Sequence, residues 1–190
     1  MPSPRAWRHS PTEAVFVGFA GRIGAGKTCA AMYLNSKYGF QYARYSQVLQ
    51  QWFRAGTAER HRLQSLGWDI MAGGLQVALN ARLIAGLDRA RSAAIDGLRH
   101  PTDFDSLSAA FGASFRLVFL EAPQEVRFER LRSRYATGDA FQAAETQPVE
   151  AYIDNLRPLA TLVIPNDGSV PSLHQRLDEW LAAEQMGDPK

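Results

Sequence analysis

The chain lacks the marks of a secreted or membrane protein. Of its 190 residues only one, Cys29, is a cysteine, so no disulfide can form within the chain, and this fits a reducing compartment. The apolar stretch 14–20 is too short to span a bilayer, and the longer stretch 71–87 is interrupted by polar residues and a glycine pair. Residues 1–11 contain three prolines and two arginines but no apolar segment, so we expect no signal peptide. These features predict a cytoplasmic protein without a membrane partner.

The chain also lacks a large excess of charge of either sign. Lys and Arg number 21 and Asp and Glu 19, which gives a formal net charge of +2. Nucleic-acid-binding domains usually have a strong basic excess, so this balance disfavours such a partner without excluding one. Hydrophobic residues make up 46% of the chain, enough to build a core. We see no repeat and no linker, and predict a single domain over residues 1–190, with residues 1–11 flexible.

Apolar stretches alternate with helical patterns along the chain, which is typical of the α/β class with a parallel sheet and crossover helices. We expect a long helical region over about 59–91, broken near Gly73 and Gly74, and Ser46 as the N-cap of the helix before it. The predicted strands are 15–19, 40–44, 93–96, 115–121 and 161–164. The other predicted helices are 27–38, 171–184 and two that begin at Pro101 and Pro123.

The most specific pattern in the sequence is the segment 21–28, GRIGAGKT, which fits G-x-x-x-x-G-K-[ST] between an expected strand and an expected helix. Glycines let successive backbone N–H groups of such a P-loop point at phosphate oxygens, and the helix N-terminus adds its positive dipole. Lys27 would reach the β and γ phosphates, and the hydroxyl of Thr28 would ligate Mg²⁺. We therefore predict an ATP site that comprises Gly21, Ile23, Gly24, Ala25, Gly26, Lys27, Thr28 and Cys29.

Candidate residues for a phosphoryl acceptor follow the predicted strands. Asp96 and Arg99 come after the third strand, and ligands of such sheets bind at the carboxyl ends of the strands. Asp96 would hold Mg²⁺ through water or orient the attacking oxygen, and the planar fork of Arg99 would clamp a phosphate. The alternative is an ordinary turn. Arg62 would bind a phosphate and Gln64 would read a base edge, although a solvated helix face explains both equally well. Weaker candidates are Arg44 and Ser46, at the end of the second strand, where an acceptor could also rest.

Three arginines of the helix that begins near Pro123 are spaced three and four residues apart: Arg127, Arg130 and Arg134. A helix would place them on one face. That face is either solvated, or it leads into a lid over about 135–146. In the second interpretation Arg130 and Arg134 neutralise charge on the moving phosphoryl group while the lid excludes water.

The turn after the fifth strand contains Asn166 and Gly168. A ligand at the carboxyl ends of the strands would have its base close to this turn. We therefore predict that Asn166 and Gly168 contact the adenine through the backbone. A simple strand-to-helix turn is the competing interpretation.

In their order along the chain, these motifs resemble the P-loop nucleoside monophosphate kinase superfamily over about residues 15–180. They are most similar to its deoxynucleoside monophosphate kinase and dephospho-CoA kinase branch. The resemblance implies a five-stranded parallel sheet in the order 2-3-1-4-5, helices for the acceptor over about 46–90, and a short lid. It also implies ATP as donor, Mg²⁺ as cofactor and a small-molecule nucleotide as acceptor. The segments that carry it are 21–28, 62–64, 95–99, 127–134 and 166–168.

One departure from that pattern bears on the acceptor. Dephospho-CoA kinases carry an aspartate pair just after the second strand, where this chain reads Ala43-Arg44-Tyr45-Ser46. The departure favours a deoxynucleotide kinase, but two other functions remain open. One is a non-catalytic module that senses ATP or a deoxynucleoside triphosphate, and the other is a kinase for dephospho-CoA or a sugar acid. The acceptor base, the sugar and the oligomeric state, a homodimer included, also stay open.

Two further activities are disfavoured by what the sequence lacks. No N-K-x-D element follows the fourth strand, which argues against a switch GTPase. The H-x-E and P-C-x-x-C zinc signature of nucleotide deaminases is also missing, so we expect no deaminase chemistry in this chain.

Overall fold

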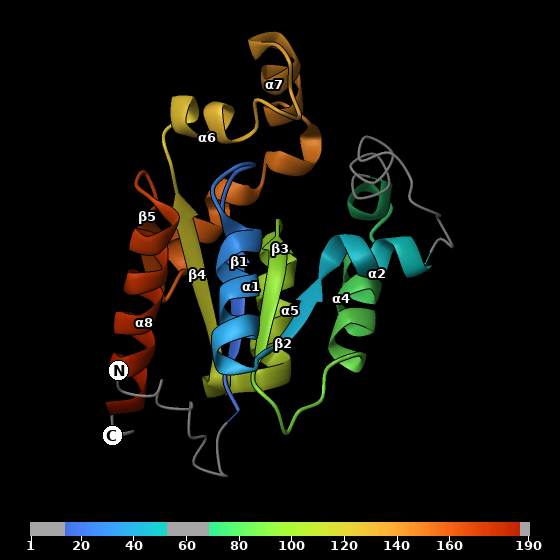
Figure 1. Ribbon diagram of the computed structural model, residues 1–190. Helices are drawn as coiled ribbons and strands as arrows, with labels where there is room; N and C mark the ends of the chain where they lie inside the picture. The colour runs from blue at the N-terminus through green and yellow to red at the C-terminus, as the bar shows by residue number, and fades with distance from the viewer. Residues whose placement is uncertain (1–13, 53–68, 187–190) are drawn as a thin grey trace.

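A computed structural model describes residues 14–52 and 69–186, which form a five-stranded parallel sheet with helices on both faces (Figure 1). The order of the strands is β2-β3-β1-β4-β5, and every pairing is parallel. The predicted α/β class and strand order are therefore confirmed. The strands are β1 (Phe16–Ala20), β2 (Gln41–Arg44), β3 (Ala93–Leu98), β4 (Phe115–Glu121) and β5 (Leu162–Pro165).

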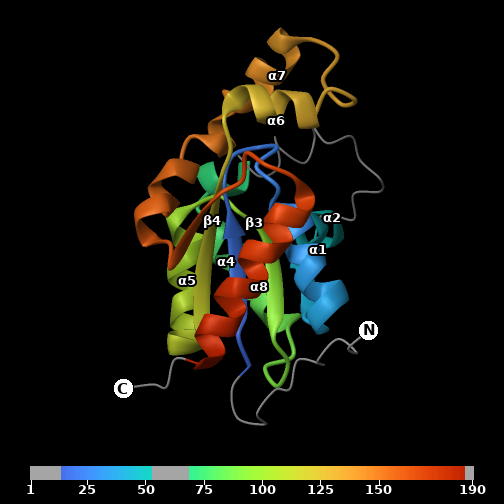
Figure 2. The ribbon, with the colours of Figure 1, turned by 60° about the vertical axis from the view of Figure 1, so that its left-hand side comes forward.

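The two faces of the sheet bury two separate cores (Figures 1 and 2). Alternate residues of β1 point to opposite faces: Phe16 packs with α4 and α5, and Val17 packs with α1 and α8. Burial on both faces explains why this strand is apolar throughout. The helices are α1 (Lys27–Tyr38), α2 (Tyr45–Trp52), α4 (Gln76–Ala85), α5 (Pro101–Phe111), α6 (Gln124–Arg130), α7 (Gly138–Glu145) and α8 (Val170–Met186), with short 3₁₀ segments η1 (Gly112–Ser114), η2 (Pro148–Glu150) and η3 (Ile153–Leu159).

Several helix ends follow from local sequence. Gly39 ends α1 in the left-handed conformation, with φ 72°, and its N–H donates to Asn35 O. Pro101 is the first residue of α5, and His100 caps that helix in a reciprocal pair with Asp103. Within the described ranges no helix is both long and apolar enough to cross a bilayer.

Two predictions about the acceptor helices are wrong. Ser46 is not an N-cap, because α2 begins at Tyr45, directly after β2. The helical region does not reach residue 91 either, since α4 ends at Ala85. The chain after α4 is held as a turn instead, because the Gln41 amide donates to the carbonyls of Asp88 and Arg91 at 2.7 and 2.9 Å. The break at Gly73-Gly74 is confirmed.

Some predictions concern residues outside the described part of the chain. Arg62 and Gln64, the predicted flexible residues 1–11 and the start of the predicted helical region all lie there.

Helix α1, which follows the P-loop, is tied to α8 through Asp178. Its carboxylate accepts hydrogen bonds from Tyr33 at 2.8 Å, Tyr38 at 2.5 Å and Lys37 at 2.6 Å. Burial opposes ionisation of Asp178, but hydrogen bonds from Lys37, Tyr38 and Tyr33 outweigh burial and lower its pKa. Ionised Asp178 therefore stabilises the packing of α1 on α8.

We expect Asp178→Asn to lower the melting temperature at pH 7 by about 2–4 °C. Because the carboxyl pKa is lower in the folded than in the unfolded chain, this stabilisation is present at neutral pH. It begins to fade below about pH 4 and is lost as the pH falls through the folded-state pKa. Thermal unfolding of the wild type and Asp178→Asn across this pH range measures the difference between their melting temperatures, with Glu179→Gln as control. A difference that stays constant in acid would contradict the explanation.

Candidate functional site

The P-loop 21–26 joins β1 to α1 and adopts a conformation that only glycine allows at three positions. Gly21, Gly24 and Gly26 have φ values of 136°, 80° and 103°. A Cβ on Gly21 would lie 2.3 Å from Leu120 O, and one on Gly26 would lie 2.4 Å from the Asn166 amide nitrogen. Both conformation and space therefore explain the glycine pattern of this loop.

Lys27 is buried beneath the loop. Its Nζ donates to the carbonyls of Gly21 and Arg22, at 2.5 and 3.0 Å. Burial and, secondarily, the nearby Arg99 charge lower the pKa of Lys27 to about 8. An anion beside Nζ would favour the charged form and raise this pKa again. The site is thus suited to a ligand that brings negative charge.

Asp96, near the end of β3, is the meeting point of three elements. Its Oδ2 accepts from the Thr28 hydroxyl at 2.7 Å and from the Tyr42 hydroxyl at 3.0 Å, and lies 3.3 Å from Arg44 Nε. Burial, followed by the charge of Asp96, raises the pKa of Tyr42 to about 12, so this phenol stays protonated and donates. Mg²⁺ is bound by few protein oxygens alongside phosphates and water. The hydroxyl of Thr28 and the carboxylate of Asp96 fit such an ion.

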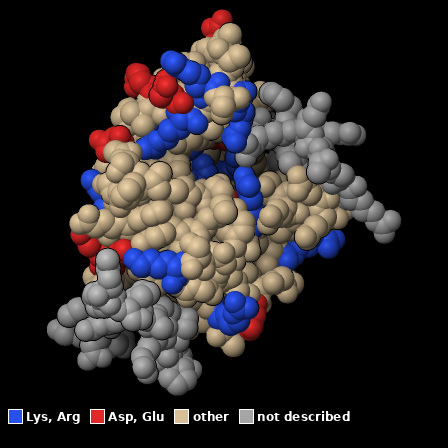
Figure 3. Space-filling model, viewed as in Figure 1, with Lys and Arg blue, Asp and Glu red and all other residues tan. Residues whose placement is uncertain are grey.

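A cavity of about 670 Å³ opens above the carboxyl ends of the strands. Figure 3 shows it as a hollow in which Lys and Arg side chains gather. Among the residues that the structure describes, two carboxylates line it, those of Asp96 and Asp103. Five cations of the same described part line it as well, Lys27, Arg44, Arg99, Arg130 and Arg134, so the charge of these residues favours anionic ligands.

The structure brings most of the predicted site residues together around this cavity. The predicted residues that line it, besides those five cations, are Ile23, Gly24, Gly26, Thr28, Cys29, Ser46 and Asp96. Gly21 and Ala25 take part through their backbones, which accept hydrogen bonds from Lys27 and Asn166.

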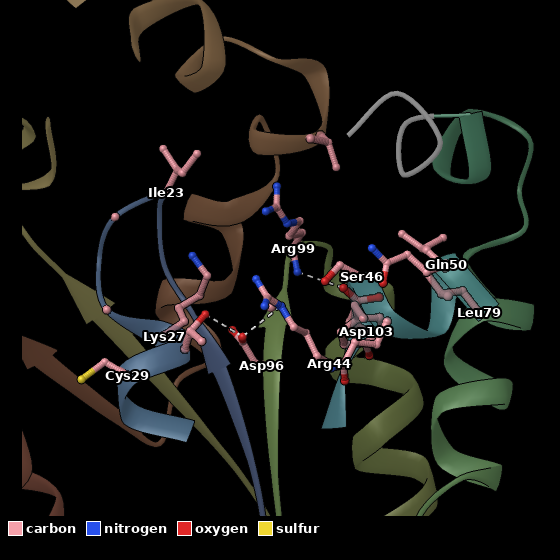
Figure 4. Close-up of a pocket in the computed structure, with 18 of the residues that line it drawn as sticks. Ile23, Lys27, Cys29, Arg44, Ser46, Gln50, Leu79, Asp96, Arg99 and Asp103 are labelled. Atoms are coloured by element: carbon pink, nitrogen blue, oxygen red, sulfur yellow. Dashed lines mark hydrogen bonds and ion pairs between the residues drawn. The ribbon is translucent and has the colours of Figure 1, made fainter. Parts of the chain in front are cut away.

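The close-up shows the order of these groups (Figure 4). Lys27 and Cys29 lie at one end, and Gln50 and Leu79, from α2 and α4, lie at the other. Arg44 and Arg99 lie between the two ends. A ligand that fills the cavity would therefore meet the P-loop first, then arginines, then the α2 and α4 end.

Arg99 is held by two acidic residues that sequence reasoning missed. Its backbone N–H donates to Asp103 Oδ2 at 2.9 Å, and its guanidinium pairs with the buried Glu150 of η2. Asp103 could have been found, since the third residue after the N-cap is a capping-box position. Glu150 could not, because nothing in the sequence relates a residue 51 positions away to Arg99.

The prediction that three arginines share a helix face is wrong. Helix α6 ends at Arg130, so Arg134 lies in the turn that follows. Arg127 is buried, with Nη1 donating to Ile23 O at 3.1 Å and pairing with Glu145 of α7. Exposed Arg130 donates to Gly168 O at 2.9 Å. Arg127 therefore joins the P-loop to α7, within the predicted lid, whereas Arg130 and Arg134 face the cavity.

Asn166 has a role in the structure that sequence reasoning did not foresee. Its side chain, 5% exposed, donates to Ala25 O at 2.8 Å. Its backbone N–H donates to Glu121 O at the end of β4. Asn166 thus supports the P-loop from behind, and its predicted contact with adenine, like that of Gly168, stays a prediction.

Comparison with known proteins gives two results at the level of sequence. No protein-family model matches the chain. A UPF0200 protein of Halobacterium salinarum is 30% identical over 102 residues, in each of two strains. That match covers 52% of this chain and 54% of the relative, so the chain spans about half the length of the curated relatives it matches.

Solved structures match nearly the whole chain. Shikimate kinase from Acinetobacter baumannii, in complex with shikimate, has a TM-score of 0.60 and 18% identity, covering 93% of this chain and 97% of that one. The Mycobacterium tuberculosis APS kinase CysC, in complex with AMPPNP and APS, has a TM-score of 0.58 and 20% identity, covering 90% and 99%. A gluconokinase from Sinorhizobium meliloti has a TM-score of 0.59 and 16% identity, covering 93% and 94%. The chain has the P-loop kinase fold.

Proposed function

We propose that this protein transfers the γ-phosphoryl group of ATP to the phosphate of a nucleoside monophosphate or a similar nucleotide. The observation that carries the proposal is the order of groups in the cavity: the P-loop, then Arg44 and Arg99, then the α2 and α4 end (Figure 4). A nucleotide acceptor has the same order, with a phosphate that must meet the γ-phosphoryl group and a base that extends away from it.

The donor side would hold a triphosphate. When bound, ATP would supply the phosphoryl group, and Mg²⁺ would neutralise charge on its phosphate oxygens. Backbone N–H groups of the P-loop and Nζ of Lys27 would bind the phosphates, and Thr28 and Asp96 would hold the metal ion. An acceptor oxygen forms a new bond to the γ phosphorus as the bond from that phosphorus to the β–γ bridging oxygen breaks, so ADP leaves. No oxidant or reductant is needed.

The acceptor side combines charge with an apolar slot. Arg44 and Arg99 would clamp the acceptor phosphate, since guanidinium groups bind phosphate oxygens in pairs. Beyond them, Leu49, Met71 and Leu79 line the cavity. An apolar slot with polar groups at its edge suits a flat base better than a small sugar acid.

The segment that includes α7 would act as a lid. Arg130 and Arg134 line the cavity from this side and remain exposed. They would contact the phosphates when the lid closes, and closure would exclude water that otherwise hydrolyses ATP.

ADP release from Mg²⁺-ATP tests the proposal directly. The panel consists of ribo- and deoxynucleoside monophosphates together with dephospho-CoA, shikimate and gluconate. We expect one nucleotide to raise ADP release well above the rate without acceptor. Stimulation by dephospho-CoA or a sugar acid alone would replace the nucleotide with that acceptor. Binding of ATP without stimulation by any compound would favour a nucleotide sensor.

We expect Arg99→Gln to raise the KM for the acceptor by about 10- to 100-fold, because a charge-assisted hydrogen bond is lost. The Kd for ATP should change by less than about threefold, since phosphate binding to the P-loop stays intact. Steady-state kinetics and ATP titration measure the two effects. Arg99→Gln also leaves Glu150 without its partner, so the double variant with Glu150→Gln separates binding from stability. Arg116→Gln is the control, because Arg116 lies near the amino end of β4, whereas Arg99 follows the carboxyl end of β3; Arg116 also pairs with a carboxylate, that of Glu184. If the KM for the acceptor is unchanged in Arg99→Gln, Arg99 does not bind the acceptor.

A further inference from the structure

Gln76 lines the cavity and was not singled out from the sequence. It is the first residue of α4, it is 9% exposed, and it lies with Leu49 and Leu79 in the lining. Its side-chain Nε2 donates to Asp103 Oδ1. A nearly buried amide at the wall of a binding cavity can read the hydrogen-bonding groups of a ligand, provided that its orientation is fixed.

Asp103 fixes that orientation. Its Oδ1 accepts from the side-chain amides of Gln76 and Asn80, and its Oδ2 accepts from the backbone N–H groups of Arg99 and His100. Four donors fill the acceptor positions of a carboxylate, which has no proton to donate. The amino end of Gln76 must therefore face Asp103, and the oxygen end must face the other way.

The amide oxygen of Gln76 is available to a ligand. In the described part of the chain no group donates to this Oε1, and no buried side-chain oxygen is left without a partner. This Oε1 therefore keeps accessible surface, and it belongs to a residue that lines the cavity. The protein thus presents an oriented acceptor beside the apolar slot, and a matching ligand would carry an N–H donor.

Asn80 provides an internal comparison, one turn further along α4. It donates to the same Asp103 oxygen at 3.0 Å, but its own oxygen accepts from the Tyr45 hydroxyl. Asn80 is fully buried and is not part of the cavity lining. The two amides therefore share a partner, and only Gln76 has an oxygen left for a ligand.

We propose that Gln76 determines the base specificity of the acceptor by accepting a hydrogen bond from its exocyclic amino group. The proposal rests on the nucleotide acceptor proposed above. Cytosine and adenine carry such an amino group, whereas uracil and hypoxanthine carry a carbonyl oxygen in its place. A carbonyl would face Oε1 with no proton between the two oxygens, and an unpaired buried polar group is disfavoured.

The experiment compares acceptors that carry either an amino group or a carbonyl at this position, with a ring nitrogen beside it that is unprotonated in the first and protonated in the second. For the wild type we expect kcat/KM to favour the amino member by about tenfold or more in one of these pairs, as expected for one buried hydrogen bond. In Gln76→Leu the ratio should fall to about threefold or less, because neither member can pair. The pairs are cytidylate with uridylate and adenylate with inosinate, each as ribonucleotide and deoxyribonucleotide.

Asn80→Leu is the matched control. It removes a hydrogen bond to the same carboxylate, so both variants should lose stability, but the control should keep the amino preference. Gln76→Met, closer in shape to glutamine, serves as a second variant if Gln76→Leu is too unstable to assay.

The outcomes separate the two proposals. Loss of the preference in the Gln76 variants, and its retention in Asn80→Leu, supports base reading by Gln76. Nucleotides that stimulate turnover without an amino preference in the wild type, or a preference that survives in the Gln76 variants, overturn base reading and leave the kinase proposal intact. If Asn80→Leu loses the amino preference to the same extent, the preference depends on the hydrogen bonds to Asp103 as a whole, and the role of Gln76 is overturned. If no nucleotide stimulates turnover, the nucleotide kinase proposal fails and the base reading fails with it.

Discussion

Replacement of Lys27 by methionine should lower kcat by about 10²–10³-fold or more, because in the proposed function its charge would stabilise the transferring phosphoryl group. Methionine has a similar length and suits a buried position, so the fold should survive. Burial also lowers the pKa of Lys27 to about 8. Its replacement therefore relieves unfavourable burial, and we expect stability to be unchanged or raised.

ADP release at saturating acceptor measures this effect, and thermal unfolding checks the fold. Lys37→Met is the matched control, since Lys37 lies on the same helix but outside the cavity lining. The control should keep wild-type kcat. A Lys27→Met protein that retains more than about a tenth of wild-type kcat would contradict the role given to Lys27.

Replacement of Arg127 by methionine should lower the free energy of unfolding by about 3–5 kcal/mol. Arg127 and Glu145 are both buried, each with a side chain 6% exposed. Removal of the arginine leaves a buried carboxylate without its counter-charge, and it also leaves Ile23 O without that donor. Urea unfolding measures the loss, and the shift should appear in the midpoint rather than in the slope.

Two further variants identify the cause of this loss. Arg132→Met removes an exposed arginine that pairs with Glu129, and should change stability by less than about 1 kcal/mol. The double variant Arg127→Met/Glu145→Leu removes both buried charges, and should recover much of the stability lost in the single variant. If the double variant is no more stable than Arg127→Met, the unpaired carboxylate is not the reason.

Much of the fold was predictable, because local chemistry decides it. The bounds of α1 and β4 agree with the predicted ones, since glycines flank the helix and the strand contains a buried apolar run over residues 117–120. The glycines of the P-loop likewise predict a loop with left-handed backbone conformations, as observed at Gly21, Gly24 and Gly26. At such positions the residues close in sequence indicate the local structure.

The supports of the site could not be predicted in the same way. Spacing placed Arg127 on a face with Arg130 and Arg134, but its burial depends on a carboxylate of α7 and a carbonyl of the P-loop. Likewise, Gln76 is informative only because Asp103, 27 residues later, takes its amino group. Periodicity reports which residues share a face of a helix, and it does not report what packs against that face.

The P-loop is supported from distant parts of the chain, and this has a consequence for synthesis. Its carbonyls at Ile23 and Ala25 are bound by Arg127 and Asn166, which follow them by 104 and 141 residues. A chain emerging from the ribosome exposes the complete phosphate-binding motif long before either supporting residue has been made. Contacts at such long sequence separation form late and slowly. The supported conformation of the loop is therefore reached only after Asn166 has been made, and a chain that stops before this residue would have the motif without the loop that it specifies.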